Sequence, residues 1–191
     1  MNAFRTAAVV LAAALISQAG LAGAPRGGGE PTKAGAKAFA PNDGGFSVEF
    51  PAKPVAQERK LDLPDGGTAT LKSFLFESDR KDRALMVAFV DVPDGTAETE
   101  DELLDNAVNG FAAGAGAGEP TSKRVMLNGH LGREFECQLD DKLTFRGRIY
   151  FARGRLYQVI AAGSEDYVAG DTAIKFIKSF KITGPAGKHQ D

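Results

Sequence analysis

The 191-residue sequence contains one cysteine, two histidines and no tryptophan. With a single thiol, Cys137, the chain cannot form an internal disulfide, so its apolar core must hold the fold together. One cysteine and two histidines also supply too few nitrogen and sulfur ligands for a tetrahedral zinc site. No GxSxG elbow and no Gly-Lys-Ser/Thr phosphate loop occurs in the sequence. The usual motifs of serine hydrolases and P-loop nucleotide-binding enzymes are therefore missing.

An excess of charge of one sign is also missing. The chain has 23 Lys and Arg residues against 25 Asp and Glu residues, for a formal net charge of -2 at pH 7. A protein with this balance has no overall attraction to nucleic acid or to an anionic membrane. We therefore expect no nucleic-acid partner, and any basic patch must be local.

The N-terminal apolar run is too short to cross a bilayer comfortably. It follows a short positive head, MNAFR, and precedes small residues, which is the pattern of a signal peptide. We interpret residues 1–22 in this way, with cleavage after Ala19 or Ala22; an uncleaved anchor is the alternative. No cysteine stands directly after the apolar run, where a lipoprotein would carry its lipid-modified cysteine, which argues against a lipoprotein. The prediction is export to the periplasm or the extracellular space, without a membrane span after cleavage.

The rest of the chain reads as one domain with two appendages. Residues 23–44 are rich in Gly, Ala and Pro and have no apolar period, as in a flexible tether. The tail at residues 184–191 has a similar composition. A single globular α+β domain is expected over residues 45–183.

Several segments alternate apolar and polar residues, which is the pattern of β-strands. FSVEF (46–50) is the first predicted strand, and the PDGG turn (64–67) joins the next two into a hairpin. ALMVAFVDV (84–92) is apolar at consecutive positions, which predicts a central strand covered on both faces. This segment alone implies a layered fold.

The pattern then changes to helical spacing. Thr99 and Glu102 form a capping-box pair before an apolar stripe, and GAGAG (114–118) ends the predicted helix. Strands resume after it and turn at Asn128-Gly129. A second helix is expected to start at Ser164, although Gly170 and Thr172 weaken it, and FKI (180–182) is the candidate for a short closing strand.

The segment LTFRGRIYFARGRLYQV (143–159) alternates apolar residues with arginines. A three-residue loop at 140–142 would pair Glu136 with Arg146 and Glu134 with Arg148 across antiparallel strands. A second turn at Arg153-Gly154 would place Tyr150 opposite Tyr157. We therefore interpret the segment as a hairpin and not as a nucleic-acid surface, which needs free aromatics beside uncompensated charge. The alternative function is an anion-binding or partner-binding surface made of Arg146, Arg148, Arg153 and Arg155.

The residues best suited to catalysis, a cysteine nucleophile and a histidine base, are not expected to lie within hydrogen-bond distance of each other. Cys137 and His130 lie in one predicted strand, seven positions apart, which is roughly 23 Å at 3.3 Å per residue, and they point to opposite faces. Cys137 is expected to be a small buried apolar residue. We expect no cofactor; the acidic segment that includes Asp91, Asp94 and Glu98 is an alternative hard-cation site, although solvation of a loop next to a helix N-terminus explains it.

The order of the predicted elements, together with the segments at the start and at the end of the predicted domain, resembles that of the Mog1/PsbP-like family. The segment at the start is GGFSVEFPAKP, with Phe46, Phe50 and Pro51. The segment at the end contains Tyr157 and the Ser179-Phe180 pair. The resemblance implies an antiparallel β-sheet flanked by helices, an α/β/α sandwich. It also implies a mostly non-enzymatic family, with accessory subunits of photosynthetic complexes, a GTPase-binding nuclear-transport factor and exported bacterial proteins.

The leading functional hypothesis is a non-catalytic, exported binding or accessory module. Its expected partner is an extracytoplasmic protein, and the chain itself is expected to be a monomer. Two alternatives remain open: a hydrolase that uses two carboxylates from distant strands, and binding of an anionic ligand through the hairpin from Arg146 to Arg155.

Overall fold

The structure is a computed structural model that describes residues 38–62, 67–93, 99–140 and 143–183. The predicted signal peptide, residues 23–37 of the predicted tether and the predicted tail lie outside the described residues. The same holds for most of the PDGG turn and for the tip of the hairpin at 141–142.

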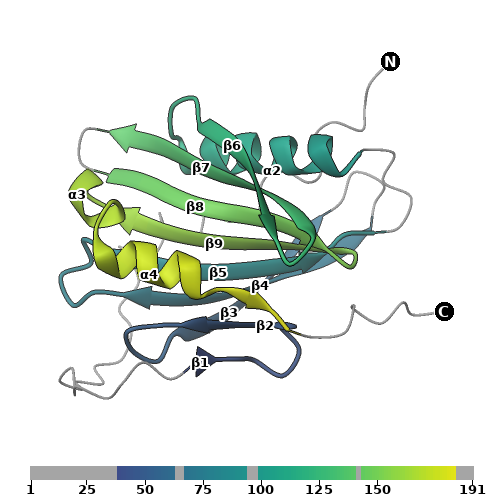
Figure 1. Ribbon diagram of the computed structural model, residues 1–191, viewed down its shortest axis with the longest axis horizontal. Helices are drawn as coiled ribbons and strands as arrows, with labels where there is room; N and C mark the ends of the chain where they lie inside the picture. Colours follow the sequence, from purple (N-terminus) through teal and green to yellow (C-terminus); the bar gives the residue numbers. More distant parts are fainter. Residues whose placement is uncertain (1–37, 63–66, 94–98, 141–142, 184–191) are drawn as a thin grey trace.

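Seven antiparallel strands form the main sheet (Figure 1). In spatial order they are β3 (Val55–Asp62), β4 (Thr68–Glu77), β5 (Ala84–Asp91), β9 (Arg155–Gly163), β8 (Leu143–Ala152), β7 (His130–Asp140) and β6 (Thr121–Leu127). Every residue of β5 except Asp91 is buried. The prediction of a central strand covered on both faces is therefore confirmed.

Helix α2 (Glu100–Ala115) packs on one face of the sheet. The Thr99 hydroxyl accepts a hydrogen bond from the Glu102 amide at 3.3 Å, and the Glu102 carboxylate accepts one from the Thr99 amide at 3.0 Å. This capping box satisfies amide groups at the helix start, as predicted. On the buried side, the ring of Phe111 contacts those of Phe135 and Phe145 at centroid distances of 5.2 and 5.4 Å.

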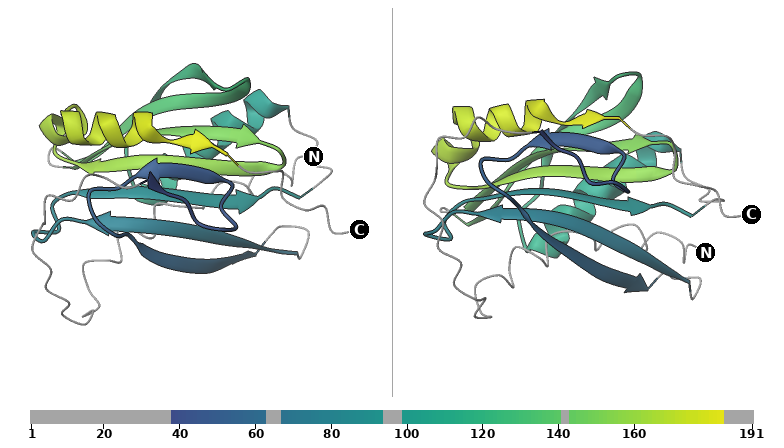
Figure 2. Two further views of the ribbon diagram at one scale, coloured as in Figure 1. Left: turned by 60° about the horizontal axis from the view of Figure 1, so that its bottom comes forward. Right: turned by 90° about the horizontal axis from the view of Figure 1, so that it is seen from below.

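The opposite face carries a three-stranded sheet and two short helices (Figure 2). They are β1 (Ala38–Phe39), β2 (Phe46–Glu49), β10 (Lys181–Ile182), α3 (Glu165–Val168) and α4 (Asp171–Ser179). Phe46 lies under this cover and is 1% exposed; its ring packs against those of Phe74, Phe89, Tyr157 and Phe180.

Three expectations need correction. The single helix expected from Ser164 is two helices, because Gly170 adopts an extended conformation and becomes the N-cap of α4. Strand β1 lies inside the segment that was predicted to be a tether. The ring of its residue Phe39 contacts the rings of Phe50 and Phe74. The sandwich is also only partly helical: the main sheet dominates, and β1, β2 and β10 share the second face with α4.

The hairpin of β7 and β8 has the predicted register. Glu134 is opposite Arg148, Glu136 is opposite Arg146, and the second turn places Tyr150 opposite Tyr157. The closing loop differs from the prediction. Asp140, not Leu139, is opposite Leu143, because the register shifts after Gln138. Leu139 is left without an opposite residue and is 39% exposed, as in a β-bulge next to a turn.

Candidate functional site

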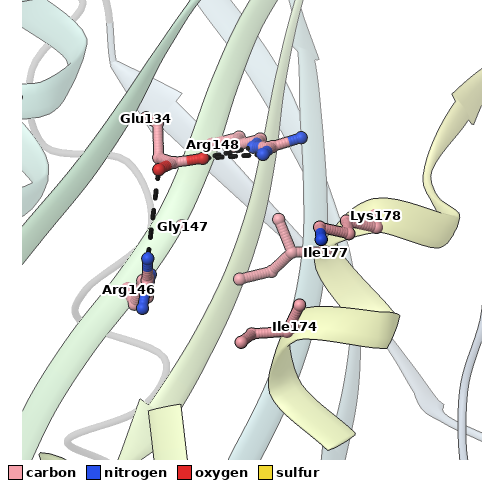
Figure 3. A pocket seen from close by; sticks show the side chains of 7 residues that line it. All are labelled: Glu134, Arg146, Gly147, Arg148, Ile174, Ile177 and Lys178. Atoms are coloured by element: carbon pink, nitrogen blue, oxygen red, sulfur yellow. Dashed lines mark hydrogen bonds and ion pairs between the residues drawn. The ribbon is translucent and has the colours of Figure 1, made fainter. Parts of the chain in front are cut away.

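A groove between α4 and strands β7 and β8 is the candidate site (Figure 3). Helix α4 contacts β2 and β9, and the groove lies between this helix and residues Glu134 of β7 and Arg146 to Arg148 of β8. The groove has a volume of about 160 Å³. We call it the α4–β8 groove; its lining residues are Glu134, Arg146, Gly147, Arg148, Ile174, Ile177 and Lys178.

One wall of the groove is an ordered ion pair. Arg148 donates from Nε to the Glu134 carboxylate at 2.8 Å, and Lys123 of β6 lies 2.8 Å from the other carboxylate oxygen. Burial acts to raise the pKa of Glu134, but the hydrogen bonds from Lys123 and Arg148 outweigh it and hold this pKa below its ordinary value. Glu134 is therefore an ionised acceptor that fixes Arg148 in place.

Two cations of the groove are not neutralised in this way. The nearest carboxylate oxygens to Arg146 among the described residues are on Glu134 and Glu136, at 4.0 and 3.9 Å, too far for hydrogen bonds. Lys178 is exposed, and no carboxylate of the described residues lies within ion-pair distance of its Nζ atom. Their donors remain available to an additional acceptor.

The helix side of the groove is apolar. Ile177 is 7% exposed and belongs to the core under α4. Ile174, one turn earlier, is half-buried, points toward β8 and packs against neither hydrophobic core cluster (Figure 3). The groove thus places an apolar strip of α4 opposite the guanidinium groups of β8.

The four arginines singled out in the sequence do not form one surface. Arg146 and Arg148 line the groove, whereas Arg155 is opposite Ala152, six residues farther along β8, or roughly 20 Å at 3.3 Å per residue. Arg155 donates to Asp91 at 2.6 Å and to the Asp43 carbonyl at 2.7 Å, with its guanidinium 4.5 Å from the centroid of Phe89. It therefore anchors the segment before β2.

Arg153, the fourth of these arginines, occupies the β8–β9 turn with a φ of 55° and is exposed. It is not among the residues that line the groove.

The predicted separation of Cys137 and His130 is confirmed. Both belong to β7, and its register is continuous between them, with the bulge lying beyond Cys137. Cys137 is buried in the core under α2, where burial, with a smaller contribution from the charge of Glu136, raises the pKa of its thiol to about 11. A thiol in this state is neither a nucleophile nor a metal ligand.

The acidic segment before α2 is only partly described. Asp91 forms an ion pair with Arg155, and Asp94 and Glu98 lie outside the described residues. Within the described ranges, no three His, Cys, Asp or Glu side chains come together as metal ligands.

Two other charged clusters lie elsewhere on the described residues. Arg133 on β7 binds Asp105 at 2.7 Å and Asp101 at 2.6 Å, and so ties α2 to the sheet. The second cluster borders a cleft of about 330 Å³ formed entirely by residues 78–83 of the β4–β5 loop. There Ser78 donates to Asp82 at 2.7 Å, and Arg83 lies over the ring of Tyr167. The Nη1 atom of Arg133 has no hydrogen-bond partner among the described residues but is enclosed by the protein, and the second cleft has no apolar residue in its lining, unlike the α4–β8 groove.

The alternation of apolar residues and arginines pointed to Arg146 and Arg148, but no sequence feature indicated a role for Lys178 or the place of Ile174 in a groove. The sequence contained only a weak indication of the helical side of the groove. Ile174 and Lys178 are four positions apart and so share a face of α4, but nothing in the sequence places that face beside β8.

Comparison with known proteins supports the fold. No family model and no curated protein matches the sequence. Among solved structures, the fold is similar to the solution structure of cyanobacterial PsbP (CyanoP) from Synechocystis sp. PCC 6803, with 12% sequence identity and a TM-score of 0.52. The match covers 83% of this chain and 99% of that chain. The PsbP-like fold is thereby confirmed, while function does not follow from the fold alone.

The helices of the structure are short or carry many polar residues. Within the described ranges, none is both long and apolar enough to cross a bilayer.

Proposed function

We propose that this protein is a non-catalytic, exported accessory module that binds another extracytoplasmic protein. The observation that carries the proposal is the contrast between two sets of groups. The thiol that could act as a nucleophile is buried, and the carboxylates of Glu134, Asp101 and Asp105 are paired with arginines or lysines. Arg146, which lies no closer than 3.9 Å to a carboxylate oxygen of the described residues, and Lys178 instead line a shallow groove suited to recognition.

The alternative of a carboxylate hydrolase receives less support. Such an enzyme needs two facing carboxyl groups, one with a raised pKa that lets it act as the general acid. The α4–β8 groove contains one carboxylate, Glu134, and its pKa is lowered. Two carboxylates, Asp79 and Asp82, line the second cleft, and the pKa of Asp82 is lowered chiefly by a hydrogen bond from Ser78, the opposite of what a general acid needs.

Export and a protein partner also agree with the N-terminal segment and with the family resemblance of the sequence. Residues 1–22 have the pattern of a signal peptide. The Mog1/PsbP-like resemblance implies accessory and partner-binding proteins. The size of the groove points the same way, because a drug-sized ligand needs a pocket of about 300–1,000 Å³, and this groove has about 160 Å³.

The test is capture followed by measurement of affinity. The full chain, immobilised through a C-terminal tag, is exposed to the extracytoplasmic fraction of its own organism, with the heat-unfolded chain as the matched control. Each enriched protein is then purified and titrated by calorimetry. We expect at least one protein to bind saturably with a defined stoichiometry. Absence of saturable binding, together with turnover of any substrate in a hydrolase panel, would overturn the proposal.

A further inference from the structure

We propose that the α4–β8 groove binds an acidic segment of the partner protein, with one carboxylate held between Arg146 and Lys178 and an adjacent apolar side chain against Ile174. This inference rests on the proposed function and adds to it the location of the binding surface and the chemistry of the occupant.

The charge of the groove selects an acidic occupant. Three cationic side chains and a single carboxylate line it, in a protein whose net charge is -2. Arg148 and Glu134 satisfy each other at 2.8 Å, so the surplus cations are Arg146 on the strand and Lys178 on the helix. Figure 3 shows them on opposite sides of the opening. A carboxylate that enters between them accepts charge-assisted hydrogen bonds from both sides.

The apolar strip selects what accompanies the carboxylate. Ile174 is half-buried without belonging to a core cluster, and it faces the guanidinium side of the groove. An apolar side chain that packs on it removes the remaining exposed surface from water. A free phosphate or a small carboxylic acid gains nothing from this strip. A peptide that carries Glu or Asp next to Leu, Ile or Val uses both features.

The size of the groove limits the occupant to side chains. A volume of about 160 Å³ has room for one or two side chains but not for a folded domain or a drug-sized molecule. The remainder of the partner therefore lies over strands β6, β7 and β8 beside the groove, where Lys123 is exposed and Glu136 and Arg146 are half-exposed. Opposite charges at such a rim raise the association rate and make it sensitive to salt.

The test uses the full-length, isotope-labelled protein and a blocked eight-residue peptide of alternating Glu and Leu. Backbone amide resonances are followed by NMR as the peptide is added. The matched probe is the same peptide with Gln in place of Glu, and inorganic phosphate and vesicles containing anionic lipid are added separately. The variants are Arg146→Glu and Lys178→Glu in the groove, with Arg153→Glu as a control that makes the same change of charge at an exposed turn.

We expect saturable shifts confined to β7, β8 and α4 with the Glu peptide, and binding about tenfold weaker with the Gln peptide. Arg146→Glu and Lys178→Glu should each weaken binding by about tenfold or more, whereas Arg153→Glu should leave it within about twofold. Raising the salt concentration should weaken binding of the Glu peptide and leave that of the Gln peptide nearly unchanged. Unperturbed spectra of the variants elsewhere in the sheet confirm that they are folded.

Several results would overturn the inference. They are the absence of shifts at millimolar peptide, equal binding of both peptides, an equal loss in Arg153→Glu, and tighter binding of phosphate or vesicles than of the Glu peptide. The proposed function can survive these results. If the partner captured from the extracytoplasmic fraction binds Arg146→Glu as tightly as the wild type, the chain is a binding module and the groove is not its binding surface.

Discussion

Replacement of Phe46 by alanine tests whether strand β2 and its neighbours are an integral layer of the fold. Phe46 is 1% exposed and contacts four other aromatic rings at centroid distances of 5.5 to 6.2 Å. Truncation of a phenylalanine in such a core costs about 3–5 kcal/mol, from lost burial and from the cavity left behind. This is a large part of the total stability of about 5–15 kcal/mol that is usual for a domain.

Urea unfolding measures the loss. With a slope of about 2 kcal/mol per molar urea, the midpoint of Phe46→Ala should fall by about 1.5–2.5 M at an unchanged slope. The matched control is Val55→Ala at the start of edge strand β3, where the side chain is 63% exposed, and we expect a change within about 0.5 kcal/mol. A midpoint within about 0.5 M of the wild type for Phe46→Ala would refute the packing of β2 against the main sheet.

Three further predictions concern the Cys137 thiol, the half-buried Glu134 carboxylate and the β8–β9 turn. Because burial raises the pKa of Cys137 to about 11 from 9.0, its reaction with a thiol reagent at pH 8 should be at least about 100-fold slower in the native protein than in urea, and similar rates would contradict its burial. The pKa of Glu134 is lowered in the fold, so the stability it contributes is present above the ordinary pKa of 4.5 and is lost as the pH falls through the lower, folded-state pKa. Acid titration from about pH 7 to pH 3 should therefore cost the wild type more unfolding free energy than Glu134→Gln, and parallel curves would refute this. Gly154 has a φ of 73°, and a Cβ added there would meet no other atom within 4 Å, so Gly154→Ala should lower stability by about 1 kcal/mol through backbone strain alone; an unchanged melting temperature would count against the turn.

Local patterns predicted the main elements of the fold well. The consecutive apolar residues of β5, the capping box at Thr99 and the turn at Asn128-Gly129 each have a short-range physical cause that is written in adjacent residues. The cross-strand pairs of the hairpin followed from turn position and alternation alone. Each of these features depends on neighbours in sequence or on a single turn.

Features that depend on distant contacts were not predictable. The two residues of β1 are too few to show alternation, and they form a strand only because β2 offers its edge. The bulge at Leu139 shifts only the last pair of the hairpin, so the pattern of β7 carries no sign of it. The α4–β8 groove requires a helix and two strands to meet. The sequence therefore showed the arginines, and Ile174 and Ile177 as a stripe of a predicted helix, but not Lys178 or that these side chains line one groove.

Site-specific photocrosslinking in living cells tests most directly whether the α4–β8 groove is a binding surface. A photoreactive amino acid is placed at position 174 in the groove and, in a separate variant, at position 55, which lies on β3 at the far edge of the sheet. We expect a discrete adduct with one extracytoplasmic protein from position 174, none from position 55, and loss of the adduct when Arg146→Glu is added. An adduct of equal yield from both positions, or none from position 174, would contradict the account.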